Sequence, residues 1–189
     1  MEDFIFKIAE TKEEKFAAYK VRFQCLTLEM GDTLYANYEN KTFKDKLDEA
    51  DKSKLFLAID TKNNEVVATQ RITFRKEIEF TADYLYDYSL VSRALGISPT
   101  QLKQRAVLHD RLSTLKPYRK HMPNLFVQLF KMCENNIREE LTEGVMMSFI
   151  NFENISALEI LMNRFDFKKI EKEYTYNKKR FYQIFKQVK

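Results

Sequence analysis

A pair of alternating segments constrains the fold of this chain more than any other part of its sequence. Residues 55–60 (LFLAID) and 66–75 (VVATQRITFR) are each typical of a strand, and the KNN turn between them offers asparagine, which tolerates a positive φ. This pattern predicts an antiparallel pair in the first half of the chain. The fold therefore contains a sheet, and the helices must pack on it.

Hydrophobic periodicity gives the order of the other elements. The main order, β-α-β-β-β-α-β-α-β-β, predicts an α/β (α+β) fold in which helices cover a mixed sheet. Helices are expected at residues 12–30, 123–141 and 154–164, short ones at 43–50, 84–90 and 99–103, and further strands at 3–9, 106–115, 145–150, 167–176 and 179–188.

Composition indicates one globular domain over residues 1–189, because 44% of the residues are hydrophobic and 14% aromatic. Only Cys25 and Cys133 are present, far apart in sequence, so we expect free thiols and not a disulfide framework. The first residues lack the apolar region of a signal peptide, and no apolar run approaches the ~20 residues of a spanning helix. We therefore expect a soluble, cytoplasmic protein without an integral membrane segment.

Several kinds of site are not supported by any motif. The chain has no P-loop, GxGxxG, HExxH, CxxC or GxSxG pattern, and two histidines with two separated cysteines make a metal site unexpected. The C-terminal KKIEKEYTYNKKRFYQIFK has the composition of a nucleic-acid surface, yet its alternation fits an amphipathic terminal hairpin better. We expect no nucleic-acid partner.

Two segments in the second half resemble the GNAT acyltransferase superfamily. RLSTLKPYR, residues 111–119, is similar to the strand and xxPxYR segment that leads into the pyrophosphate-binding helix of that family. NISALEILMNRFDF, residues 154–167, is similar to the family's NxxAxxLYxxxGF helix and following strand. The resemblance implies a GNAT-like, mostly antiparallel mixed sheet flanked by helices, and an acyl thioester bound as co-substrate.

Within that superfamily the chain resembles the N-acyl amino acid synthase and autoinducer synthase branch. That branch carries a YxxRxxxF helix, acidic residues and a strand ending in TxR. The matching stretches here are YKVRFQCL, KDKLDEAD and ATQR, which contain Tyr19, Arg22, Leu26, Asp45, Asp48, Asp51, Thr69 and Arg71.

The resemblance implies an N-acyltransferase that moves an acyl group from acyl-CoA or an acyl carrier protein to an amine, such as that of an amino acid. The alternatives are an acyl-homoserine-lactone-type synthase that uses S-adenosylmethionine, and a non-catalytic acyl- or CoA-binding or regulatory module. The chain has no tryptophan, which autoinducer synthases often carry after the first arginine, so the lactone synthase ranks lower.

Three departures from the family's pattern bear on the site. The turn at residues 119–124 (RKHMPN) lacks the glycines of the usual RxxGxG/A loop. Met162 stands where a tyrosine is often credited with protonating the leaving thiolate, and Leu108 stands where the branch has a strand carboxylate. His109 and Asp110 are the nearby candidates to replace that carboxylate.

The candidate catalytic residues lie on the strand at 106–115. Alternation places His109 and Arg111 on one face, as a base and a cationic clamp, and Asp110 on the opposite face. The alternative for His109 is a hydrogen-bonded strand histidine without a chemical role. The candidate donor-binding residues are Thr114, Leu115, Arg119, Lys120, His121 and Asn124. Together with Lys116 they form a basic turn, which either suits a pantetheine pyrophosphate or is only a solvated corner.

Arg22 and Arg71 could bind a substrate carboxylate through bidentate hydrogen bonds, or pair with Asp45 or Asp48 as structural salt bridges. Asn154 could hydrogen-bond the pantetheine arm, although its position also suits a helix cap. Lysines of the C-terminal stretch could meet an acidic acyl carrier protein.

Overall fold

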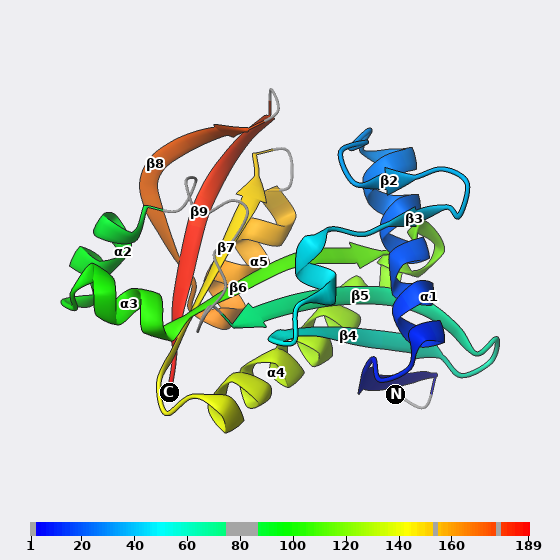
Figure 1. The fold of residues 1–189 in the computed structure, drawn as a ribbon, viewed down its shortest axis with the longest axis horizontal. Coiled ribbons are helices and arrows are strands. Elements are labelled where there is room, and N and C mark those ends of the chain that lie inside the picture. Colours follow the sequence, from blue (N-terminus) through cyan, green and yellow to red (C-terminus); the bar gives the residue numbers. More distant parts are fainter. Residues whose placement is uncertain (1–2, 75–86, 153–154, 177–178) are drawn as a thin grey trace. The chain divides into compact units, whose positions relative to one another are not determined.

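The structure is a computed structural model that describes residues 3–74, 87–152, 155–176 and 179–189. Figure 1 shows its elements in sequence order. The strands are β1 (Phe4–Ile8), β2 (Ala36–Asn37), β3 (Thr42–Phe43), β4 (Ser53–Asp60), β5 (Glu65–Phe74), β6 (Ala106–Thr114), β7 (Gly144–Asn151), β8 (Lys168–Tyr176) and β9 (Lys179–Val188). The helices are α1 (Lys12–Arg22), α2 (Tyr88–Leu95), α3 (Pro99–Arg105), α4 (Met122–Glu140) and α5 (Ile155–Phe165), with a π-helix at Phe23–Glu29 and 3-10 helices at Lys46–Glu49 and Lys116–His121.

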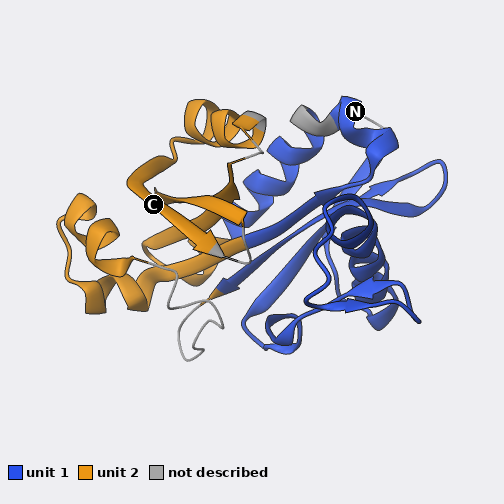
Figure 2. Ribbon diagram, turned by 90° about the horizontal axis from the view of Figure 1, so that it is seen from above, with its two compact units in different colours: residues 1–73, 110–136 blue, residues 74–109, 137–189 orange. Residues whose placement is uncertain are grey.

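Seven strands hydrogen-bond in the order β1-β4-β5-β6-β7-β9-β8, and β2 pairs with β3 separately. The pairs β1–β4, β4–β5, β7–β9 and β8–β9 are antiparallel, whereas β6 and β7 are parallel. The predicted α/β fold with a mixed, mostly antiparallel sheet and flanking helices is confirmed. The prediction of one domain over residues 1–189 stays a prediction, and the chain divides into two compact units (Figure 2).

Unit 1 comprises residues 1–73 and 110–136. One face of its β4–β5 pair packs on α1, in a core that includes Tyr19, Leu55 and Leu57. The opposite face meets α4, where the Gln70 side chain donates a hydrogen bond to Cys133 Sγ at 2.7 Å. A register shift at Ala58 marks a β-bulge in the pair. One face of the β4–β5 pair therefore packs on α4. The other face packs on α1 and carries the side chains that point toward residues 42–49.

Local sequence explains where the first helix begins. Thr11 accepts a hydrogen bond from the Glu14 N–H, and the Glu14 side chain accepts from the Thr11 N–H, which forms a capping box. The expected helix over residues 12–30 is present, but its second half is a π-helix. The β2–β3 pair that follows was not predicted, because two-residue strands leave no period in the sequence.

Unit 2 comprises residues 74–109 and 137–189. Strand β7 pairs along its whole length with β9, from Gly144 opposite Val188 to Asn151 opposite Phe181. The predicted C-terminal hairpin is present as β8 and β9. Gly144 is the first residue of β7, where an added Cβ would collide with Ile137 Cγ2.

Two short helices differ from their predicted limits. The helix expected at residues 43–50 is a 3-10 helix over Lys46–Glu49, because Phe43 belongs to β3. The helix expected at 84–90 lies partly outside the described residues, and α2 begins at Tyr88 after the N-cap Asp87. The helix expected at 99–103 is confirmed as α3.

Candidate functional site

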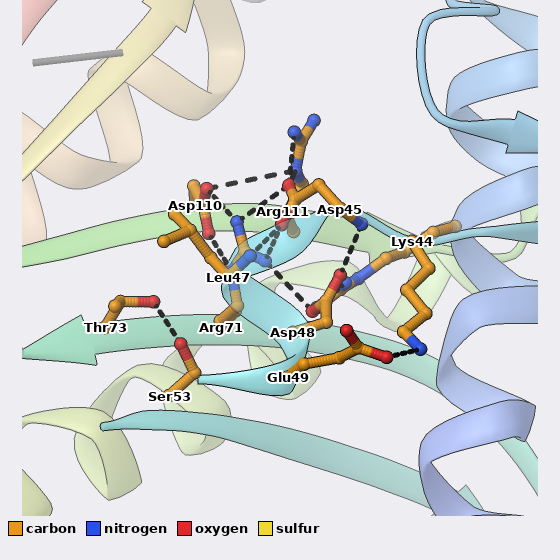
Figure 3. Close-up of polar contacts among 11 residues, drawn as sticks. Lys44, Asp45, Leu47, Asp48, Glu49, Ser53, Arg71, Thr73, Asp110 and Arg111 are labelled. Atoms are coloured by element: carbon orange, nitrogen blue, oxygen red, sulfur yellow. Dashed lines mark hydrogen bonds and ion pairs between the residues drawn. The ribbon is translucent and has the colours of Figure 1, made fainter. Parts of the chain in front are cut away.

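Charged residues from four separate segments meet in one network in unit 1 (Figure 3). Buried arginines and aspartates are expensive to desolvate unless they pair, and here each has a partner of opposite charge. The members of this ion network are Arg22, Asp45, Asp48, Arg71, Asp110 and Arg111.

Arg71 lies at the centre of the ion network. Its Nε and Nη2 donate to the two carboxylate oxygens of Asp110 at 2.9 and 2.7 Å. Its Nη1 donates to Asp45 Oδ1 at 2.6 Å and lies 3.0 Å from Asp48 Oδ1. The Arg71 side chain is only 1% exposed, so these contacts replace its hydration shell.

Arg22 enters the ion network from the last turn of α1. Its Nη1 donates to Asp48 Oδ1 at 2.7 Å, and both side chains are fully buried. Its Nε and Nη2 are also buried, and no residue that the structure describes accepts a hydrogen bond from them. These two donors form the parallel pair that binds a carboxylate in a bidentate way, so this buried edge of the guanidinium has two hydrogen bonds left to donate to an anionic group.

The 3-10 helix at Lys46–Glu49 holds the two central carboxylates in place. Asp45 caps it by accepting from the Leu47 N–H at 2.9 Å, and Asp48 Oδ2 accepts from the Asp45 N–H at 3.0 Å. Asp48 thus uses Oδ2 for the backbone and Oδ1 for the arginines, whereas Asp45 Oδ1 accepts from both the Leu47 N–H and Arg71 Nη1. Asp45 and Asp48 are thus the residues of the acidic KDKLDEAD stretch whose side chains face Arg22 and Arg71.

Strand β6 departs from alternation at Arg111. The expectation that Asp110 and Arg111 lie on opposite faces is wrong, because Arg111 has a left-handed φ of 58° and the strand turns locally. Asp110 thus bonds Arg71, while Arg111 donates to Asp45 Oδ2 through Nη2 at 2.7 Å. These two side chains are the most exposed members of the ion network, at 23% and 20%.

The neighbouring arginines favour the charged form of the Asp45 carboxyl. Burial alone raises the pKa of Asp45, but hydrogen bonds and charge from Arg71 and Arg111 outweigh it, so the pKa of that carboxyl lies below its usual value near 3.8. Burial also acts on Arg22 and lowers its pKa, yet guanidinium groups remain protonated at neutral pH. The Asp45 carboxylate and the Arg22 guanidinium are therefore both charged at pH 7.

The position of His109 bears on its predicted role as a base. It belongs to unit 2 and its side chain is 1% exposed. Such burial suits a strand histidine within a hydrogen-bonded core as well as a catalytic group that substrate must reach. Both interpretations therefore stay open.

Several residues of the predicted donor site form hydrogen bonds or ion pairs with other residues of unit 1. The Thr114 carbonyl accepts from Arg119 Nε at 3.0 Å and from Cys25 Sγ at 3.3 Å, and the Leu115 N–H donates to the Val67 carbonyl at 2.9 Å. Arg119 also pairs with Glu29 of the π-helix. These contacts brace the turn against the first helical segment.

The other donor-site predictions fall at the start of α4. Lys120, His121 and Asn124 are exposed, and a 3-10 helix over Lys116–His121 runs directly into α4 where an irregular turn was expected. The His121 ring lies 5.8 Å from the ring of Phe4. The predicted roles of these residues stay predictions, and Asn154 lies outside the described residues.

The described residues contain neither a group of metal ligands nor a membrane-spanning helix. Across the residues that the structure describes, no group of three or more His, Cys, Asp or Glu side chains could hold a metal ion. Within the same ranges, no helix is both long enough and apolar enough to cross a bilayer. Both cysteines are buried free thiols.

Comparison with known proteins identifies the fold. No protein-family model and no curated protein sequence matches this chain. Solved structures do match: FeeM, an N-acyl amino acid synthase from uncultured soil microbes, superposes with a TM-score of 0.71 at 13% identity, over 98% of this chain and 91% of FeeM. The CoA-dependent acyl-homoserine lactone synthase BjaI gives a TM-score of 0.70 at 9% identity, over 98% of this chain and 84% of BjaI.

A GNAT-family acetyltransferase from Staphylococcus aureus Mu50 matches with a TM-score of 0.63 at 12% identity, over 98% of this chain and 100% of that chain. The chain has the GNAT fold, and the structures similar to it include N-acyl amino acid and autoinducer synthases. The resemblance inferred from the sequence motifs is confirmed at the level of fold.

Proposed function

We propose that this protein is an N-acyltransferase that joins the acyl group of a thioester to the amine of an amino acid. The amine nitrogen forms a bond to the acyl carbon and the carbon–sulfur bond breaks. The nitrogen loses a proton, and the leaving thiolate gains one. Acyl transfer in general is supported by the GNAT fold, which this chain shares over 98% of its length with the synthase FeeM.

The two buried donors of Arg22 that lack an acceptor are the reason for proposing an amino acid as the acyl acceptor. Two buried donors on one edge of a guanidinium cost free energy while they lack acceptors, and a substrate carboxylate would satisfy both at once. Asp48 holds Nη1 of the same side chain and fixes its orientation. Arg22 is thus the proposed carboxylate clamp, and Arg71 is a positioning residue that forms ion pairs with three aspartates.

Asp110 is the proposed partner of the substrate amine. Its side chain is 23% exposed, the largest exposed fraction among the carboxylates of the ion network, and two hydrogen bonds from Arg71 hold it still. A fixed carboxylate can orient an ammonium group and receive a proton from it directly or through water. Arg111, beside it, and His109 are further candidates for this part of the site.

The donor is proposed to be an acyl-CoA or an acyl-phosphopantetheine on a carrier protein. Lys120, His121 and Asn124 are exposed at the start of α4 and would face its phosphates, while Arg119 is braced against Glu29. Lysines of the C-terminal hairpin are candidates for contact with an acidic carrier protein. The buried free thiols are compatible with a reducing compartment, so we place the reaction in the cytoplasm.

Two other functions fit the same fold. The likeness to BjaI favours a lactone synthase that uses S-adenosylmethionine. Met162, which has no hydroxyl proton to donate to a thiolate, favours a binding or regulatory module without catalysis.

The experiment is a panel of acyl thioesters of different chain lengths, each mixed with amino acids or with S-adenosylmethionine while free thiol is followed. Thiol release that needs an amino acid and yields an N-acyl product is expected. Release only with S-adenosylmethionine would show the lactone synthase, thioester binding without turnover would show the binding module, and neither binding nor release would refute all three.

A further inference from the structure

An open hollow of about 430 Å³ lies on unit 1 beside the first helical segment, which consists of α1 and the π-helix that follows it. None of the residues that line the hollow belongs to the ion network. In Figure 1 this segment and the β2–β3 pair lie next to each other, and β3 contacts α1. Its volume is that of an ordinary small-molecule site, roughly 300–1,000 Å³. The hollow is lined by Lys20, Phe23, Gln24, Leu28, Tyr38 and Lys41.

The hollow has an apolar wall that includes exposed side chains. Leu28 is 56% exposed and Tyr38 is 60% exposed, and the Tyr38 ring meets the Phe23 ring edge to face at 5.5 Å. Five of the eight exposed large apolar side chains in the described part of the chain lie between Phe16 and Tyr38. Such a concentration marks a surface that binds an apolar group.

The charge around this wall is positive. Two of the six lining residues are lysines and none is a carboxylate. Lys20 Nζ lies 4.8 Å from the centre of the Phe16 ring, and neither Lys20 nor Lys41 forms an ion pair with a residue that the structure describes. Two ammonium groups over an apolar wall complement a ligand with one anionic end and one apolar end.

The backbone around the hollow is also unusual. Phe23, Gln24 and Leu28 belong to the π-helix, a conformation that is rare and frequent at functional sites. Lys41 has a left-handed φ of 53°, which costs a non-glycine residue about 1 kcal/mol or more. Two uncommon backbone conformations thus border one hollow, which supports a functional role for it.

We propose that this hollow binds an amphipathic anion, a single aliphatic chain that ends in a carboxylate. The chain packs on Phe23, Leu28 and Tyr38, and the carboxylate pairs with Lys20 and Lys41. A negatively charged membrane surface fits less well, because the hollow has the volume of a site for one small molecule. The proposal goes beyond the acyl transfer proposed above, and its test does not depend on that activity.

Binding is measured by isothermal titration calorimetry with decanoate below its micelle concentration, and with decyltrimethylammonium as a cation of equal chain length. We expect saturable binding of one decanoate per chain, at least tenfold tighter than binding of the cation. The double variant K20Q/K41Q should bind decanoate about tenfold more weakly, and L28D should abolish binding. The matched controls K15Q/K62Q and I5D change exposed residues of unit 1 outside the hollow and should change affinity less than twofold.

Three results would overturn the proposal: equal binding of anion and cation, equal losses in the control variants, or no saturable decanoate binding at millimolar concentration. Co-sedimentation with phosphatidylcholine–phosphatidylglycerol vesicles, without saturable decanoate binding, would show a membrane surface instead. Thermal unfolding of each variant shows whether it folds, and the comparison of the two decyl ligands on the unmodified protein holds whatever the variants do. If the unmodified protein transfers acyl groups but does not bind decanoate, this inference is refuted and the proposed function is not.

Discussion

Arg71 and Asp110 are joined by two parallel hydrogen bonds, from Nε to Oδ1 at 2.9 Å and from Nη2 to Oδ2 at 2.7 Å. This bidentate pair ties β5 to β6 and takes up the edge of the Arg71 guanidinium that could have bound a ligand. On Arg22 the corresponding edge has no acceptor among the described residues. The two arginines that the sequence presents as equivalent substrate clamps therefore have different roles in the folded protein.

Replacing Arg71 with methionine should lower the free energy of unfolding by about 3–5 kcal/mol, because Asp45 and Asp48 would stay buried without their shared cation. Chemical denaturation followed by circular dichroism measures the change. The control is R164M, at an exposed position of α5, which should change stability by less than about 0.5 kcal/mol. Equal effects of the two substitutions would contradict the account of the ion network.

Removing both partners of the Arg22–Asp48 pair should be less harmful than removing Asp48 alone. D48L leaves a fully buried guanidinium without its carboxylate, and R22M/D48L removes that charge as well. The bond from the Asp45 N–H to Asp48 is lost in both variants, so the difference isolates Arg22. We expect the double variant to be more stable than D48L by at least about 1 kcal/mol in urea denaturation. If it is less stable, Arg22 is not held by charge pairing.

Stability should fall in acid because of Asp45. Its pKa in the folded protein lies below the usual value near 3.8, so the ionised carboxylate stabilises the fold above about pH 4. This stabilisation is lost as the pH falls from there through the lower folded-state pKa. Urea denaturation between pH 6 and pH 2 should show the decline, and D45N should be less stable at pH 6 with a flatter dependence on pH. A D45N profile parallel to that of the unmodified protein would rule out this role.

Gly144 should not tolerate a side chain while Ile137 keeps its branch. An alanine Cβ at residue 144 would collide with Ile137 Cγ2, and such overpacking costs about 1–3 kcal/mol. Ile137→Leu moves the branch away from the Cβ and should restore part of the loss in G144A/I137L. Thermal unfolding measures all three variants. A G144A protein as stable as the unmodified one would show that the neighbouring residues adjust without cost.

The sequence predicts the sheet because its strands carry their own signals. The alternation of β4 and β5 and the turn between them are local properties, and so is the capping box that begins α1. The π-helix at Phe23–Glu29 and the two-residue strands β2 and β3 have no comparable signal. Their conformations depend on contacts such as that between Phe23 and Tyr38, which single-sequence patterns do not contain.

The candidate site is predictable in its members but not in its pairing. Arg22, Asp45, Asp48 and Arg71 stand out through resemblance to known motifs, but the choice between substrate clamp and salt bridge depends on atoms brought together over long sequence separations. The turn of β6 at Arg111 is a further example. A left-handed non-glycine residue leaves no mark in the sequence, so simple alternation puts Arg111 on the face opposite to Asp110.

Asp110→Asn separates the proposed contact with the amine from a purely structural role. The amide keeps the size of the carboxylate and can still accept from Arg71, but it cannot take a proton or bind an ammonium group by charge. If Asp110 serves the amine, kcat for acyl transfer should fall by about 10²–10⁴ while affinity for the acyl thioester is unchanged. The control D60N alters another aspartate of unit 1, which accepts from Tyr118 Oη at 2.8 Å, and should leave kcat within twofold. Lower stability of D110N with an unchanged kcat would show that Asp110 only holds Arg71 in place.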